Sequence, residues 1–208
     1  MTKELETLNQ RLSYIVGENM ATQLKNDGLD LDTVALVLAV NDVMAGNASR
    51  LTEELKKSTV EEIQKLTQEQ QSAEQAGKAT KNQEEGVAYL AENSQKEGVK
   101  TTDSGLQYKS LVSGDGETPK ASNSVTVHYK GTLTDGTVFD SSYERGEPAT
   151  FPVGGVISGW TEVLQLMNVG DKFEVTIPSD LAYGPAGSGP VIGPDAVLVF
   201  EVELLAIA

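Results

Sequence analysis

One stretch of sequence decides the predicted fold: Val125-Thr126-Val127-His128-Tyr129, then Gly131, Asp135-Gly136 and Phe139-Asp140-Ser141-Ser142, and finally Gly155-Val156-Ile157-Ser158-Gly159-Trp160. It contains the only Trp, the only His and two of the four Phe of a chain that is 5% aromatic. Large rings gather around a concavity only where the backbone bends sharply enough to place them, and glycines allow such bends. The stretch therefore predicts an apolar pocket.

The sequence around this stretch alternates between apolar and polar residues, as the strands of a half-buried sheet do. The alternation is clear in Val125–Tyr129, Phe173–Ile177 and Leu198–Leu204. Between these strands, Trp160–Met167 places apolar residues at helical spacing. Residues 101–208 are therefore predicted to form an α+β domain, in which a curved antiparallel sheet wraps one short helix.

The first fifty residues have a different, helical pattern. One helix is predicted from Leu5 to a stop at Asn26-Asp27-Gly28, and Asp32 is placed to cap a second. The second helix contains Val34–Val40, which is apolar nearly all round. Two short helices cannot bury so much apolar surface alone, so residues 1–50 are predicted to form a homodimer. A small intramolecular bundle is the alternative.

Residues 51–100 are predicted to form a long connecting helix that starts at a Thr52 cap and stops at Gly98. Its middle is almost entirely polar, which is typical of a solvated spacer between domains. A disordered linker is the competing interpretation, favoured by the Gln-rich run Gln68–Gln71. The helix is preferred because helix-forming residues dominate and the apolar period resumes at Val87 and Leu90.

Composition excludes several classes of function. The chain has no Cys and one His, which removes thiolate nucleophiles and His-rich metal sites, and no metal or cofactor is predicted. The net charge of -15 opposes nucleic acid and anionic membrane as partners. A cytoplasmic location is predicted, because no segment is apolar over the length of a bilayer and the first six residues are too polar for a signal peptide.

Several motifs together resemble the FKBP-type peptidyl-prolyl cis-trans isomerases over roughly Gly105 to Ala208. The motifs are Val127-His128-Tyr129-x-Gly131, Asp135-Gly136-x-x-Phe139-Asp140-Ser141-Ser142, Val156-Ile157-x-Gly159-Trp160, Ala182-Tyr183-Gly184 and Leu198–Leu205. The first hundred residues are similar to the helical dimerisation region of the macrophage-infectivity-potentiator branch. The resemblance implies a dimer whose long helices each carry a catalytic domain.

The resemblance also implies an activity and a site. Rotation about a peptide bond faces a barrier of about 18–20 kcal/mol, and an apolar cavity favours the twisted amide, which has less charge separation than the planar one. The implied catalytic residues are Tyr129, Phe139, Asp140 and Tyr183. The implied substrate-binding residues are Phe151, Val156, Ile157, Trp160, Phe200, Arg145 and a flap over the pocket formed by Val191 and Ile192.

The implied partners are unfolded or partly folded proteins with X-Pro bonds and the macrolide inhibitors of the family. A non-catalytic chaperone or scaffold that binds proline-containing segments is the alternative function. The sequence departs from the family pattern at Ala149, Ser188 and Gly193, which puts substrate preference in doubt more than activity. His128 alternates away from its neighbours and is expected on the opposite sheet face in a structural role.

Overall fold

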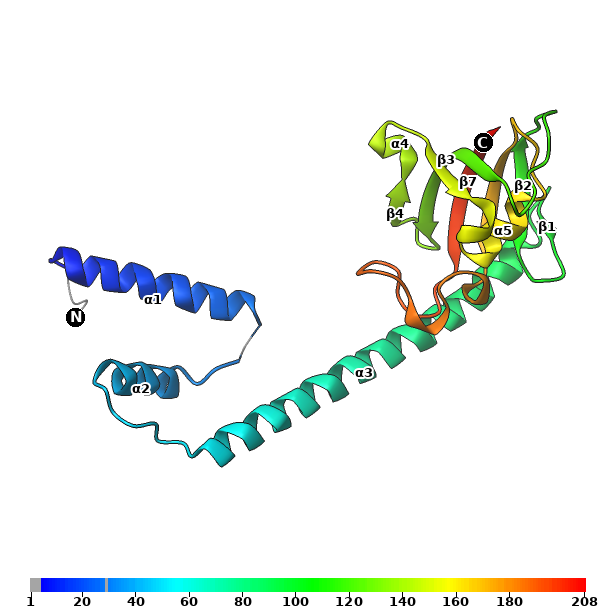
Figure 1. Cartoon of the computed structure of the whole chain (residues 1–208). Helices are drawn as coiled ribbons and strands as arrows, with labels where there is room; N and C mark the ends of the chain where they lie inside the picture. The colour runs from blue at the N-terminus through cyan, green and yellow to red at the C-terminus, as the bar shows by residue number, and fades with distance from the viewer. Residues whose placement is uncertain (1–4, 29) are drawn as a thin grey trace. The chain divides into compact units, whose positions relative to one another are not determined.

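The computed structural model describes residues 5–28 and 30–208 (Figure 1). The chain divides into two compact units, Met1–Gln64 and Lys65–Ala208, so the division falls inside the long helix. The predicted segment boundaries at residues 50 and 100 remain predictions. Within the described ranges, no helix is long and apolar enough to cross a membrane.

The first unit contains two short helices with well-formed N-termini. Helix α1 spans Leu8–Asn26 and starts with a capping box, in which Thr7 and Gln10 satisfy each other's backbone N–H groups. Helix α2 spans Thr33–Met44, and the Asp32 carboxylate accepts hydrogen bonds from the N–H groups of Val34 and Ala35, as predicted. Neither helix has a buried residue, so their apolar side chains face solvent in the single chain.

Helix α3 spans Glu53–Asn93 without a break, which confirms the helix over the disordered linker. The Thr52 hydroxyl accepts a hydrogen bond from the N–H of Leu55, as expected of an N-cap. The helix ends at Asn93, five residues before the predicted stop, and Gly98 lies in the following turn with a φ of 83°. Charged pairs one turn apart, such as Lys78 with Glu74, line its polar surface.

The second unit is built on one antiparallel sheet in the order β1-β2-β6-β7-β3-β4, with β5 paired to β3. The strands are β1 Lys100–Thr101, β2 Gln107–Val112, β3 Ser124–Leu133, β4 Val138–Ser141, β5 Ala149–Pro152, β6 Lys172–Ile177 and β7 Leu198–Ile207. The short helices are α4 Ser142–Arg145 and α5 Ser158–Leu164, and 3-10 turns occur at Val153–Gly155, Ser179–Leu181 and Gly184–Ala186. This is the predicted α+β arrangement.

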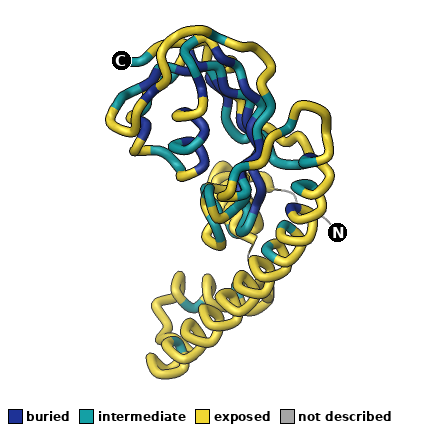
Figure 2. Tube along the Cα trace, turned by 90° about the vertical axis from the view of Figure 1, so that its right-hand side faces the viewer, coloured by how far each residue is buried: buried dark blue, intermediate teal, exposed yellow. Residues whose placement is uncertain are grey.

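The core of the second unit lies between the sheet and α5, and Figure 2 shows the buried residues concentrated there. Strand β3 alternates as predicted, with Val125, Val127 and Tyr129 buried. His128 lies on the opposite face, where its ring stacks on Tyr143 at a centroid distance of 4.7 Å. The alternation predicted from sequence therefore has its expected physical cause, one buried sheet face.

The end of α3 is fastened to the sheet of the second unit. The buried Asn93 side-chain amide donates to the Gln107 side-chain carbonyl at 2.9 Å and lies 3.3 Å from the Thr176 hydroxyl. The Gln107 amide in turn donates to the main-chain carbonyl of Leu90 at 2.9 Å. Buried amides are costly unless they are paired, so these bonds fix where the helix meets strands β2 and β6.

Candidate active site

A cavity of about 510 Å³ opens on the second unit between β3, β4, β5, α5 and the loop that precedes β7. Its lining is mostly aromatic and aliphatic: Tyr129, Phe139, Asp140, Phe151, Gly155, Val156, Ile157, Trp160, Tyr183 and Phe200. Sheet, helix and loop thus contribute to one concave surface, as the crowded aromatic residues predicted.

Trp160 lines this cavity and is the centre of its ring contacts. It is 4% exposed and meets Tyr129, Phe151 and Phe200 nearly edge to face, at centroid distances of 5.3, 5.9 and 5.4 Å. Phe139 continues the wall, 5.5 Å from Phe200. Edge-to-face contacts are the favoured geometry of aromatic rings, so each ring restrains its neighbours.

Two glycines allow this close fit. At Gly159 in α5, an added Cβ would lie 2.5 Å from Cγ2 of Ile177, so the helix can approach the sheet only without a side chain there. At Gly131 in β3, a Cβ would lie 2.5 Å from Phe139 and 2.8 Å from Phe200. Gly131 therefore leaves the space in which two cavity rings stand.

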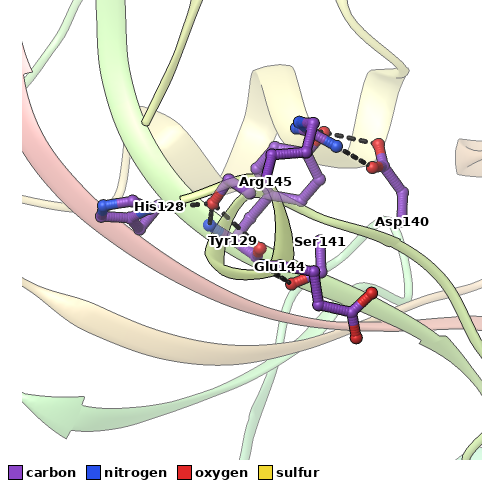
Figure 3. Close-up of polar contacts among 7 residues, drawn as sticks. His128, Tyr129, Asp140, Ser141, Glu144 and Arg145 are labelled. Carbon is purple, nitrogen blue, oxygen red and sulfur yellow. Dashed lines mark hydrogen bonds and ion pairs between the residues drawn. The ribbon is translucent and has the colours of Figure 1, made fainter. Parts of the chain in front are cut away.

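A polar cluster formed by Tyr129, Asp140 and Arg145 adjoins the cavity, since Tyr129 and Asp140 are among its lining residues; Figure 3 shows the contacts within the cluster. The Tyr129 hydroxyl donates to Asp140 Oδ2 at 2.5 Å and accepts from Arg145 Nη2 at 2.9 Å. Arg145 also forms an ion pair with Asp140 Oδ1. Both carboxylate oxygens are thereby occupied by donors from the protein.

The cluster shifts the ionisation of its members in opposite directions. Burial raises the pKa of the Tyr129 hydroxyl, and the hydrogen bond to the carboxylate raises it further. Burial also pushes the pKa of Asp140 upward, but the hydrogen bonds from Tyr129 and Arg145 outweigh it, so that this pKa lies below its ordinary value. The cluster is therefore a neutral phenol held by a charged carboxylate and a guanidinium.

Ser142 holds the backbone of Tyr129 in place and was not among the predicted site residues. Its buried hydroxyl bonds both the N–H and the carbonyl of Tyr129, at 2.7 and 3.1 Å, and lies 2.9 Å from His128 Nδ1. The motif Asp140-Ser141-Ser142 was noted in the sequence, but a hydroxyl that braces a neighbouring strand leaves no periodic pattern. Gly155, which also lines the cavity, lies in the stretch that predicts the pocket but was not predicted as a site residue.

The structure brings most of the predicted site residues together. Nine of them line the cavity, and Arg145 reaches it through Asp140 and Tyr129. Val191 and Ile192 do not line it. They line a second cavity of about 530 Å³ between their loop and α3. The flap over the pocket that the resemblance implies for these two residues therefore stays a prediction.

The positions that depart from the family pattern are also placed. Ala149 is half-buried against the core, in strand β5 and two residues before the cavity residue Phe151. Ser188 and Ile192 pair through two backbone hydrogen bonds of 2.8 and 3.2 Å, and Gly193 lies beside Asn82 of α3. Two of the three departures therefore lie in the loop that faces the helix.

The sheet wrapped on one short helix and the ring-lined cavity define an FKBP-type isomerase. The family model described as FKBP-type peptidyl-prolyl cis-trans isomerase matches residues 115–205, and the domain amino-terminal to it matches residues 9–109. The chain belongs to this family. It is an enzyme that isomerises peptide bonds before proline, which decides against the non-catalytic alternative.

Within the family the chain is of the Mip and FkpA kind. It is 45% identical to the FKBP-type 22 kDa peptidyl-prolyl cis-trans isomerase of Escherichia coli, over 99% of this chain and 98% of that protein. It is 44% identical to the outer membrane protein MIP of Legionella longbeachae, over 98% and 87%. The crystal structure of FkpA from Escherichia coli matches with a TM-score of 0.81 and 37% identity, covering 98% of each chain.

Proposed function

We propose that an X-Pro bond of the substrate twists inside the cavity above Trp160, with the proline ring against Val156 and Ile157. The largely apolar lining of the cavity supports this, because a substrate amide bound against it would lose the water that stabilises the planar, more charge-separated form. The N–H of Ile157 has no acceptor in the part of the chain that the structure describes, which leaves it available to a substrate carbonyl.

In this proposal Asp140 does not act as a general base. Rotation about the bond requires no proton to be removed, and both carboxylate oxygens already accept from Tyr129 and Arg145. Asp140 instead fixes the Tyr129 ring and places a negative charge beside the twisting carbonyl carbon. Tyr183, which lines the cavity and is 40% exposed, donates its hydroxyl to a substrate carbonyl.

A short proline-containing tetrapeptide tests this use of the cavity, since it requires no capture of a folding chain. The Trp160→Ala and Phe139→Ala variants should each lose roughly tenfold or more in kcat/KM, equivalent to at least about 1.4 kcal/mol of transition-state stabilisation. Circular dichroism would establish that both variants remain folded. Full activity in both folded variants would refute the assignment of the reaction to this cavity.

We also propose that the enzyme is a homodimer joined through the first unit and that the paired units help to capture larger substrates. The support is the apolar surface of α1 and α2, of which no residue is buried in the single chain. Light scattering should give a mass near twice 22.1 kDa. A monomer at micromolar concentration would contradict the dimer, and unchanged protein refolding by a monomeric variant would contradict the capture role.

The cytoplasmic location and the binding of macrolide inhibitors are further parts of the proposal. The name of one relative points to a different location, since the Legionella longbeachae protein is named an outer membrane protein. Fractionation of cells that express the untagged chain tests the location, and recovery outside the cytoplasm would refute it.

Inhibition of tetrapeptide turnover by a macrolide tests the binding, since the ring-lined cavity offers the apolar surface that such a ligand needs.

A further inference from the structure

We propose that α3 contributes positioning residues to the reaction: Asn82 and Gln83 hold in place the loop that carries Tyr183. This inference rests on the proposed role of the Tyr183 hydroxyl. It assigns to the connecting helix a part in catalysis besides its predicted part as a spacer.

The helix is bonded to the loop between β6 and β7, drawn in orange beside α3 in Figure 1. The Asn82 side-chain amide donates to the main-chain carbonyl of Pro194 at 2.8 Å. The Gln83 side-chain amide donates to Asp195 Oδ2, also at 2.8 Å. Two consecutive helix residues thus form hydrogen bonds to two consecutive loop residues, each 112 positions further along the sequence.

Asp195, which bonds to Gln83, has an uncommon backbone conformation. This conformation lets Asp195 connect the helix to the segment that carries Tyr183. Its φ is 55°, the one positive value among the non-glycine residues that the structure describes. Aspartate tolerates this left-handed region better than most residues, but the conformation needs support from its surroundings. In it, the N–H of Asp195 donates to the carbonyl of Gly184 at 2.9 Å. Gly184 directly follows Tyr183.

Close packing next to these bonds limits how far the loop can shift on the helix. An added Cβ at Gly86, one turn after Asn82, would lie 2.7 Å from Cγ2 of Val197. Gly86 and Val197 are both buried, as are Ile192 and Ala196 of the same loop. The loop therefore packs against the helix with buried apolar contacts as well as with the two amides.

The Tyr183 segment needs this support, because no strand holds it. Tyr183 lies between the 3-10 turns Ser179–Leu181 and Gly184–Ala186, and its side chain is 40% exposed. A mobile tyrosine must be ordered each time it binds a carbonyl, and that entropy cost reduces transition-state stabilisation. A segment that Asp195 fixes to the helix is already ordered in the folded protein, so binding the carbonyl does not have to order it again.

The test is a double-mutant cycle on the full chain, with tetrapeptide turnover as the readout. The paired variant Asn82→Ala/Gln83→Ala should lose about two- to tenfold in kcat/KM, as expected for hydrogen bonds of ordinary strength. Gln71→Ala, which changes an exposed glutamine elsewhere on the same helix, is the matched control and should keep full activity. Circular dichroism and urea unfolding would report any loss of folded protein.

Coupling to Tyr183 separates positioning from a merely structural role. In a Tyr183→Phe background, the paired variant should cause little further loss, because the hydroxyl that it positions is already absent. Equal losses in both backgrounds, or no loss in either, would overturn the inference while the effect of Trp160→Ala still supported the proposed function. Full activity of Tyr183→Phe itself would overturn the assumed role of Tyr183, and the inference with it.

A charge rescue tests the Gln83 contact directly. Gln83→Glu places two carboxylates together and should lower kcat/KM as the paired variant does. Adding Asp195→Asn restores a donor opposite the glutamate in a residue that also tolerates a positive φ, so activity should return. If the combined variant stays as inactive as Gln83→Glu while Asp195→Asn alone is fully active, the contact between residues 83 and 195 is not the cause of the loss in kcat/KM.

Discussion

Helix α2 and strand β7 are both rich in apolar residues, yet they use them in opposite ways. In β7, Leu198, Val202 and Leu204 are fully buried between the sheet and its helix. In α2, Val34 and Met44 are 77% and 83% exposed, and no residue of the helix is buried. An apolar segment indicates that something will cover it, but only its pattern indicates how many sides need covering.

Charges placed on α1 are expected to have the strongest effect, because they would lie in the interface of the proposed dimer. Leu12→Asp/Val16→Asp changes two residues one turn apart on α1, each more than half exposed in the single chain. If a second copy covers them, the charges must be desolvated, and association should weaken by about a hundredfold or more. Sedimentation equilibrium measures the change.

The control for this prediction is Val112→Asp, which puts one charge on an exposed residue of the sheet unit and should leave the mass unchanged. Retention of the dimer by the α1 variant would mean that the apolar face of α1 is covered by something other than a second copy.

The next effect concerns the core of the second unit. Leu204→Ala removes a fully buried side chain and should lower the free energy of unfolding by about 2–5 kcal/mol. Urea unfolding followed by Trp160 fluorescence measures this, because Trp160 is the only Trp of the chain and lies in the second unit.

Leu8→Ala, a change at a residue 77% exposed in the first unit, is the control and should leave this transition in place. A comparable shift in both variants would show that the two units unfold together.

Gly131→Ala adds one methyl group to the second unit, and Gly17→Ala adds one to the first. At Gly131 the new Cβ meets Phe139 and Phe200, so we expect about 1–3 kcal/mol of destabilisation and a clear loss of tetrapeptide turnover. At Gly17 in α1 nothing lies within 4 Å, and alanine should stabilise the helix by up to about 1 kcal/mol. A weaker dimer in Gly17→Ala would instead place that position against a partner.

A small pH dependence of stability is expected from Asp140, one of the cavity residues. The pKa of Asp140 is lowered in the folded protein, so its contribution to stability is full at neutral pH and is lost as pH falls below about 3.9 through the folded pKa. Its side chain is 42% exposed, so solvent screening keeps the effect small.

Asp140→Asn should therefore flatten the decline in urea midpoint toward acid pH, compared with the unchanged protein. Asp103→Asn, at an exposed carboxylate, controls for the change in net charge. An identical acid decline in the unchanged protein and in Asp140→Asn would contradict the predicted linkage.

The sheet and the short helix could be predicted because their residues recur with a period, whereas the resemblance to the FKBP-type isomerases implied the individual residues of the cavity. Alternation along β3 and β7 places Tyr129 and Phe200 on one face, and helical spacing after Ile157 brings Trp160 beneath them. A period describes which face of an element is buried. It therefore predicts contacts between neighbouring elements well.

The contacts of the loop before β7 could not be predicted in this way. Val191 and Ile192 lie on an irregular loop, and their orientation toward α3 depends on single amide bonds such as the one from Asn82 to Pro194. Bonds of this kind join residues far apart in the sequence and recur at no interval. For the same reason, the hydrogen bond between the Ser142 hydroxyl and the Tyr129 backbone could be recognised only from the structure.

The junction of Asn93 with Gln107 and Thr176 has a consequence for the exchange of modules between related genes. A recombination point at residue 100 would join a native helix end to a foreign sheet and leave buried amides without their partners. A point near residue 65, where the compact units divide, would carry the helix end and its sheet together. Chimaeras joined at the earlier point should inherit a complete catalytic module.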